Sequence, residues 1–259
     1  MGALLKSEWR KLIYARAHWG LLIGAILVAG LGTAVTPVIL DNPDSGFGLG
    51  LDQTQAVDAV YANAISGYFF AIIIGIMLMS GEFRHGTAVA TFLTAPKRGT
   101  VLATKLAIAA IGGMLVMVIA TAAGLAAGWI ALSFFPDAAS PTNEVFINTL
   151  LAAVVSGAIL GIVGVALGTL IRNQMLAITG ALIYLFVIDP ILLALAPDAG
   201  KYLPVGLITA MLALDIDAPE FGIDTSAYLP PLTATLVLLG YGAVFATLAI
   251  ATSLRRDIE

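Results

Sequence analysis

Six apolar stretches of at least 18 residues divide the chain, each bounded by charged residues or by clusters of Gly and Pro. An α-helix needs about 20 such residues to cross a bilayer, so the pattern predicts six membrane-spanning helices. The third and fourth stretches are longer than a bilayer requires, which indicates tilt or protruding ends. The predicted spans are Trp19–Ile39, Ala59–Met79, Leu106–Phe135, Val145–Ile171, Met175–Ala196 and Leu232–Leu254.

Three further segments are neither spans nor simple loops. Residues 1–18 place apolar side chains near helical spacing between basic ones, which predicts an amphipathic helix at the membrane interface. Residues 80–105 form a long connection with apolar positions three and four apart, so a short surface helix is expected there. Residues 197–229 contain an apolar stretch too short to cross a bilayer, which predicts a re-entrant or interfacial helix.

Composition supports a membrane protein over a soluble one. Hydrophobic residues make up 60% of the 259 residues and charged residues only 11%, against about 25% charged in a soluble domain. Disorder would need low hydrophobicity and high charge. We therefore predict an all-α integral membrane protein, with residues 1–259 forming a single six-span domain. The chain has no cysteine, which excludes disulfides and thiolate chemistry.

The distribution of basic residues predicts the orientation. Eleven of the twelve Lys and Arg fall in the N-terminal segment, the 80–105 loop, the loop at Arg172 and the C-terminal tail, and only Lys201 falls on the other side. The positive-inside rule therefore places both termini in the cytoplasm, as an even number of spans requires. The expected location is the bacterial cytoplasmic membrane.

Motifs for catalysis and metal binding are missing from the sequence. It has no G-x-x-x-x-G-K-[ST] phosphate loop, no H-E-x-x-H and no G-x-S-x-G. Its two histidines, His18 and His85, are far apart in sequence, so no metal site is expected. The basic groups lie at membrane edges, where they indicate topology rather than nucleic-acid binding. We predict no catalytic residue on this chain.

The stretch after the second predicted span is the most informative one. It reads Gly81-Glu82-Phe83-Arg84-His85-Gly86-Thr87, then Pro96-Lys97-Arg98, with Lys105 snorkelling at the inner end of the third span. This order resembles the ABC type-2 permeases, the six-span membrane subunits of ATP-driven exporters. The basic N-terminal helix, Tyr202-Leu203-Pro204 and Arg256-Asp257 extend the resemblance over nearly the whole chain.

The resemblance implies a division of labour between subunits. In this family the segment between spans two and three is a coupling helix that docks on a separate ATPase, which binds ATP and Mg; this chain itself would carry no cofactor. A second permease subunit, identical or homologous, would complete a dimer in the lipid bilayer. The coupling residues so implied are Glu82, Arg84, His85, Gly86, Thr87, Val89, Phe92, Leu93, Pro96 and Arg98.

Polar residues inside the spans are candidates for a translocation path. Asp189 is the one ionisable residue within a predicted span, about 10 Å from its outer end. Asp189 would line the path or act as a hinge. The alternative is a structural carboxyl that faces outer-loop water or is neutral and hydrogen-bonded. The second span adds a polar stripe beside two aromatic residues, with cavity lining and structural hydrogen bonding both open. The candidates are Asn63, Ser66, Tyr68, Phe70 and Asp189.

Two other features bear on function. The fourth span has Gly157, Gly161, Gly164 and Gly168 on one stripe, which predicts close helix packing within the chain rather than a dimer seam. The alternatives to a permease are an ion-coupled secondary transporter and a non-transporting membrane enzyme or assembly subunit. The first would show repeated halves with broken helices, and an enzyme would show converging catalytic groups.

Overall fold

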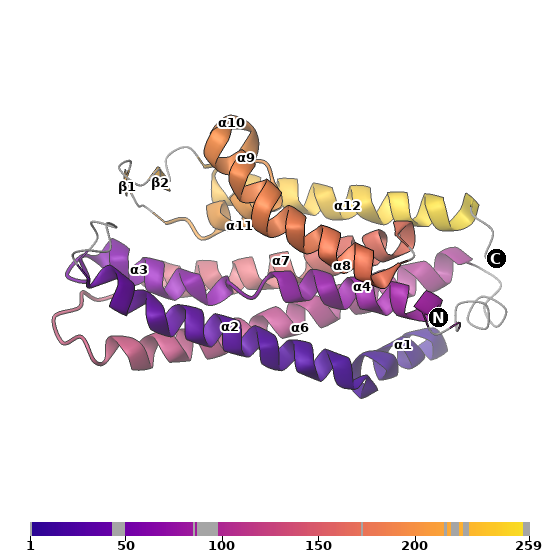
Figure 1. The fold of residues 1–259 in the computed structure, drawn as a ribbon, viewed down its shortest axis with the longest axis horizontal. Helices are drawn as coiled ribbons and strands as arrows, with labels where there is room; N and C mark the ends of the chain where they lie inside the picture. The colour runs from indigo at the N-terminus through magenta and orange to yellow at the C-terminus, as the bar shows by residue number, and fades with distance from the viewer. Residues whose placement is uncertain are drawn as a thin grey trace.

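The computed structural model describes residues 2–42, 50–84, 86, 98–171, 173–214, 217–218, 223–224 and 228–255. Over these residues the chain folds into an elongated helical bundle (Figure 1). Six of its helical segments are long and apolar enough to cross a membrane, which confirms the predicted number and makes the chain a multi-pass membrane protein by helix composition. They are Arg16–Leu40, Thr54–Arg84, Gly99–Leu132, Asn143–Leu170, Gln174–Leu195 and Pro231–Thr252.

Several spans differ in detail from uninterrupted helices. The second consists of α3 (Thr54–Ala62), a 3₁₀ turn η2 (Asn63–Ile65) and α4 (Phe69–Arg84). The fifth consists of α8 (Gln174–Ile183), a π-helical turn η3 (Tyr184–Ile188) and α9 (Asp189–Leu195). The remaining spans are α2 (Arg16–Leu40), α6 (Arg98–Leu132), α7 (Asn143–Leu170) and α12 (Pro231–Arg255).

Shorter elements flank the spans. α1 (Gly2–Tyr14) precedes the first span, and α10 (Pro197–Gly200) and α11 (Pro204–Met211) follow the fifth. α11 buries Leu207, Ile208 and Met211 in the bundle and packs against α12, α7 and α9. Two-residue strands β1 (Asp217–Ala218) and β2 (Ile223–Asp224) pair antiparallel and are the one departure from an all-helical fold among the described residues.

The third span begins earlier than its composition suggested. The prediction started it at Leu106, but α6 begins at Arg98 because Val101, Leu102 and Lys105 are buried against neighbouring helices. Likewise α4 continues to Arg84. The predicted 80–105 loop was therefore too long, and the connection between the two helices is residues 85–97, of which the structure describes only Gly86.

The core is formed by α4, α6 and α7, which pack closely through glycines. A Cβ on Gly164 would strike the carbonyl oxygen of Ile72 in α4, and one on Gly157 would come within 2.6 Å of the Gly113 oxygen in α6. Gly161 and Gly168 face the same two helices. The predicted role of the glycine stripe in packing within the chain is confirmed, because small residues let helix backbones approach.

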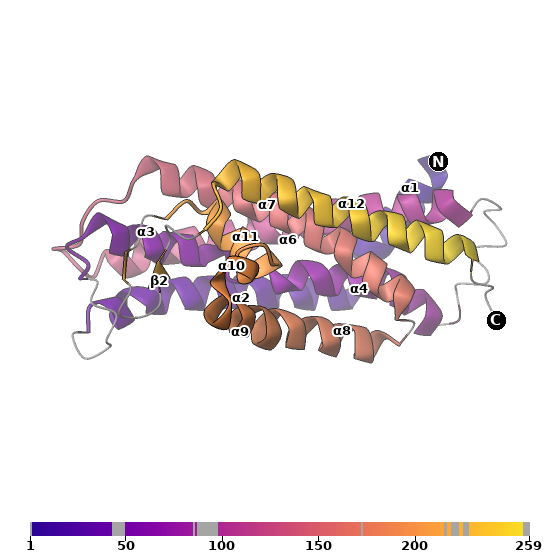
Figure 2. The ribbon, with the colours of Figure 1, turned by 90° about the horizontal axis from the view of Figure 1, so that it is seen from above.

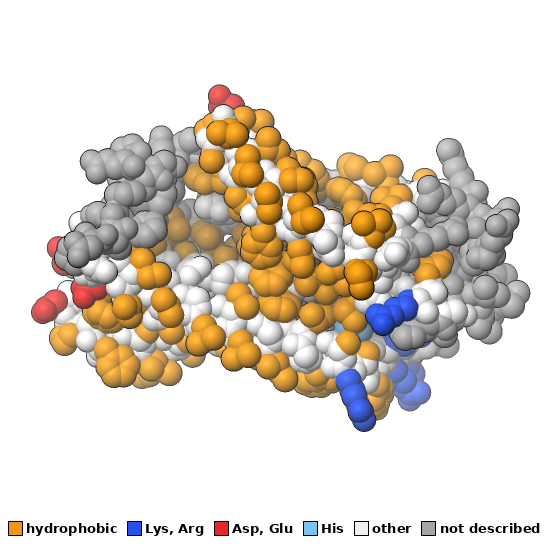
Figure 3. Space-filling model, viewed as in Figure 1, with side chains coloured by type: hydrophobic (Ala, Val, Ile, Leu, Met, Phe, Trp, Pro, Cys, Tyr) orange, Lys and Arg blue, Asp and Glu red, His pale blue; other side chains and the backbone are white. Residues whose placement is uncertain are grey.

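The bundle has two chemically different ends. α1 and the last turns of α12 lie together at what we call the terminal end, whereas the starts of α3 and α7 lie at the distal end (Figures 1 and 2). On the face shown in Figure 3, Lys and Arg side chains gather at the terminal end and acidic ones toward the distal end, with hydrophobic and uncharged side chains between them. This distribution is typical of a protein whose middle lies in lipid.

Candidate functional site

Four charged side chains from three helices form a closed ring at the terminal end, which we call the charge cluster. Lys11 Nζ lies 2.5 Å from Glu8 Oε1 and 2.7 Å from Glu82 Oε1. Lys105 Nζ lies 2.7 Å from Glu8 Oε2 and 2.8 Å from Glu82 Oε1. Glu8 and Lys11 come from α1, Glu82 from the last turn of α4 and Lys105 from the second turn of α6.

The charge cluster is buried on one side and open on the other. Lys105 has no exposed side-chain surface, Glu8 and Glu82 are also buried, and the Lys11 side chain is 45% exposed. The predicted snorkelling of Lys105 is therefore wrong, because α1 folds under the start of α6 and supplies a carboxylate there. Lys105 also donates to the Leu78 carbonyl oxygen at 3.3 Å. Two cations thus balance two anions, as burial of charge requires.

The electrostatics of the charge cluster favour the ionised forms. Burial alone would raise the pKa of Glu8, but Lys105 and then Lys11 offset it, and the pKa falls below its ordinary value. Burial would lower the pKa of Lys11, but hydrogen bonds to Glu8 and Glu82 raise it. Both shifts stabilise the ion pairs at neutral pH.

The charge cluster also fixes α1 relative to the spans. α1 ends at an elbow where the His18 Nδ1–H donates to the Leu12 oxygen and the Trp19 Nε1–H donates to the Ile13 oxygen, each at 2.8 Å. These bonds satisfy carbonyls at the end of α1 that lack helical partners. α1 is thus held to α2 by the elbow and to α4 and α6 by the charge cluster.

The predicted coupling residues divide into two groups. Glu82 lies in the charge cluster, Arg84 is exposed at the end of α4, and Gly86 turns the chain with φ +66°. Arg98 begins α6. The others lie outside the described residues: His85, Thr87, Val89, Phe92, Leu93 and Pro96. Glu82, Arg84 and Arg98 therefore bracket the connection 85–97, and Glu82 pairs with lysines of its own chain.

The candidate path residues of the second span lie where its helix is interrupted. From Asn63 to Tyr68 the backbone hydrogen bonds join residues three positions apart. For example, the Ser66 N–H donates to the Asn63 carbonyl oxygen at 3.0 Å. Asn63 Nδ2 donates to Thr36 Oγ1 at 2.8 Å. Asn63, Ser66 and Tyr68 line a cavity of about 470 Å³ shared with α11. Asn63 thus bonds to α2 and also lines the cavity.

Phe70 and Asp189 do not line that cavity. The Phe70 ring packs against Gly24 of α2. Asp189 is fully buried, and its Oδ2 accepts from the Val205 N–H at 3.0 Å, at the start of α11. Its Oδ1 has no hydrogen-bond partner among the described residues. The carboxylate therefore sits at the positive end of a helix, which has no side-chain cap of its own.

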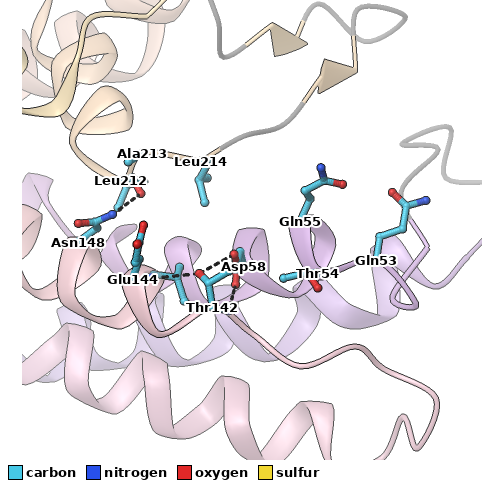
Figure 4. Close-up of a pocket in the computed structure, with 11 residues that line it drawn as sticks. Gln53, Thr54, Gln55, Asp58, Thr142, Glu144, Asn148, Leu212, Ala213 and Leu214 are labelled. Carbon is cyan, nitrogen blue, oxygen red and sulfur yellow. Dashed lines mark hydrogen bonds between the residues drawn. The ribbon is translucent and has the colours of Figure 1, made fainter.

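Two more cavities lie along the bundle. One of about 440 Å³ is mostly apolar and lies among α4, α7, α8 and α12, with Tyr184 and Tyr241 in its wall. The other, of about 550 Å³, is polar and lies at the distal end (Figure 4). There Asp58 accepts from both the N–H and the hydroxyl of Thr142 at 2.8 Å, which fixes α3 to the start of α7. The described residues contain no group of three acidic or histidine side chains that could hold a metal ion.

A comparison with protein-family models identifies the class. The model described as "ABC-2 family transporter protein" matches residues 4–188, which is more than half of the chain. The chain belongs to the ABC-2 transporter family. No curated protein matches it. In this ABC-2 transporter the matched residues include the whole charge cluster and end one residue before Asp189.

Proposed function

We propose that the chain is the membrane-spanning permease subunit of an ABC exporter, driven by a separate ATPase subunit. Family membership supports the transporter class, whose members are typically non-catalytic membrane subunits. The observation that carries the proposal further is the charge cluster. It joins the two helix ends on either side of the connection 85–97, so a push on that connection reaches α1, α4 and α6 as one unit.

The orientation and partners follow from the same proposal. Both termini lie in the cytoplasm, because eleven of the twelve basic residues are on that side. ATP and Mg bind the partner ATPase, and a second permease subunit, identical or homologous, completes the path. The sequence spacing of Val89, Phe92 and Leu93, at i, i+3 and i+4, supports a role for this connection as the coupling segment whose apolar residues enter a groove on the ATPase.

A displacement of the helices at the terminal end would change the helix positions in the distal half. The glycine contacts of α4, α6 and α7 make the centre stiff, because backbones meet there without intervening side chains. Two of the cavities lie beside η2, η3 and α11, where the helices are interrupted. These interruptions are the places where a path for an amphipathic substrate would open, with α11 as a re-entrant element.

A double substitution in the connection tests the proposal. Changing Phe92→Asp together with Leu93→Asp should remove the ATPase from the purified complex and abolish transport, because two charges cannot enter an apolar groove. Phe134→Asp is the matched control, since Phe134 is 76% exposed at the distal end and should leave the ATPase bound. The isolated chain should not hydrolyse ATP.

Two results would contradict the proposal. One is an ATPase that stays bound, with unchanged transport, in the double variant. The other is ATP hydrolysis by the verified chain alone. A reporter fused after Glu259 that is active only outside the cytoplasm would reverse the orientation.

A further inference from the structure

A cavity of about 580 Å³ opens beside the charge cluster at the terminal end. Its walls come from the elbow between α1 and α2, the last turns of α4 and the first residue of α8. Lys11, His18 and Arg84 contribute polar groups, and Met77 and Leu78 contribute apolar ones. The cavity therefore combines cationic side chains with a hydrophobic wall.

The cavity carries surplus positive charge. Glu82 also lines it, but this carboxylate already accepts from Lys11 and Lys105. Arg84 forms no ion pair with any residue that the structure describes. The His18 Nδ1–H donates to a backbone carbonyl, so in the neutral ring Nε2 is an acceptor and His18 adds no positive charge to the cavity. A guanidinium at a cavity mouth suits a phosphate, which it can bind through two hydrogen bonds.

The position of the cavity indicates where such a phosphate comes from. The spans beside it, α2 and α8–α9, have only 22% of their most apolar stretch buried, against 67% for the second span. Their outer faces are therefore not covered by other helices of this chain, and Trp19 and Met175 are exposed near the cavity end of each. Basic pockets between spans at a membrane surface bind acidic lipid head groups.

We propose that this cavity binds one anionic phospholipid from the leaflet at the terminal end, with Arg84 contacting its phosphate. The apolar wall of Met77 and Leu78 accommodates the glycerol and upper acyl region, and the chains run along α2 and α8. The site goes beyond ATPase coupling and does not depend on it. Bound lipid would brace the elbow against the end of α4, because the cavity touches both.

Lipid binding to the purified full chain tests the site. Native mass spectrometry in detergent should show one phosphatidylglycerol retained in preference to phosphatidylcholine. Arg84→Gln should weaken phosphatidylglycerol binding about fivefold, the effect expected of one surface cation. Arg16→Gln is the matched control: Arg16 is exposed at the same end but outside the cavity, and its change should have no effect on this binding.

A second pair of variants tests the space rather than the charge. Gly81 lines the cavity, and a Cβ there would meet nothing within 4 Å, so Gly81→Leu should fill the space without disturbing the helix. Gly20 also has open space but lies outside the cavity, so Gly20→Leu is its control. Gly81→Leu should abolish the preference for phosphatidylglycerol, and Gly20→Leu should retain it.

Three other outcomes would contradict the proposed lipid site. Equal losses with Arg84→Gln and Arg16→Gln would mean a diffuse basic surface. Displacement of the lipid by an excess of inorganic phosphate would mean a free-anion site. If Arg84→Gln releases the ATPase while phosphatidylglycerol binding is unchanged, Arg84 belongs to the ATPase interface. The lipid-binding results do not depend on whether the coupling proposal holds, because lipid binding is measured without the ATPase.

Discussion

The charge cluster and Asp189 show two different ways of burying acidic side chains in the same helical bundle. Glu8 and Glu82 are balanced by two lysines at the terminal end, and the ring joins α1, α4 and α6. Asp189 has no cation within ion-pair distance among the described residues and relies on the Val205 N–H at the start of α11. The first arrangement holds long helices together, whereas the second holds one short helix in place.

This difference predicts different sensitivities to mutation. Removing one charge from a balanced ring leaves a surplus charge in a buried position, which is costly. Removing the charge of Asp189 leaves behind a neutral backbone donor, which costs less. The charge cluster should therefore behave as a stability determinant, and Asp189 as a local clamp.

The largest effect is expected for Lys105→Met. It keeps the length of the side chain but leaves two buried carboxylates with one lysine, at a cost of about 3–5 kcal/mol. Thermal unfolding of the purified protein in detergent should show a large drop in Tm. Lys201→Met is the control, because Lys201 pairs with a fully exposed Asp198 and should cost less than about 1 kcal/mol. If the double variant Lys105→Met with Glu8→Gln recovers part of the lost Tm, the surplus charge is the cause. An unchanged Tm in Lys105→Met alone would contradict a stabilising role for the charge cluster.

An intermediate effect is expected at Asp189. Asp189→Leu removes the acceptor for the Val205 N–H and should destabilise the docking of α11 by about 1–3 kcal/mol. Asp189→Asn keeps an oxygen that can accept this bond and should lose much less. Hydrogen exchange at the Val205 amide is the direct measurement. Fast exchange in the Leu variant and slow exchange in the Asn variant are expected, and equal rates would exclude the clamp.

If Asp189 has a further role in transport, the Asn variant will reveal it. Asp189→Asn should then lower transport moderately while α11 stays docked and the ATPase stays bound. Normal export by this variant from pH 5 to pH 8 would make the carboxylate purely structural.

The smallest effect is expected from pH. The pKa of Glu8 is lowered in the folded protein, so its stabilisation is present above its ordinary value of 4.5 and is lost as the pH falls through the lowered value. The pKa of Lys11 is raised, so its contribution is present below 10.5 and is lost as the pH rises through the raised value. Tm should therefore be nearly flat from about pH 5 to pH 10. Glu8→Gln should make the fall of Tm at acid pH smaller. An unchanged fall would mean that a group other than Glu8 causes it.

The sequence predicted the helices better than the contacts between them. Spans, glycine packing and family followed from hydrophobicity and short motifs, which are local signals. The charge cluster could not be predicted in this way, because no local sequence signal shows that α1 folds back beneath α6. Glu8 and Glu82 were nevertheless two of only four acidic residues on the side predicted to be basic, and that rarity was the available signal. Asp189 was singled out as a buried charge, but its partner Val205 lies in a segment whose docking no periodicity could show.

The sequence separations within the charge cluster have a consequence for biogenesis. Glu8 and Lys105 are 97 residues apart and Lys11 and Glu82 are 71 apart, so α1 is synthesised long before the helices it joins. A chain emerges from the ribosome with its N-terminal part first. The ring therefore cannot close until the start of the third span, which carries Lys105, has been synthesised. Any fusion or lipid anchor that holds α1 away during this interval would leave Lys105 with Glu82 but without Glu8.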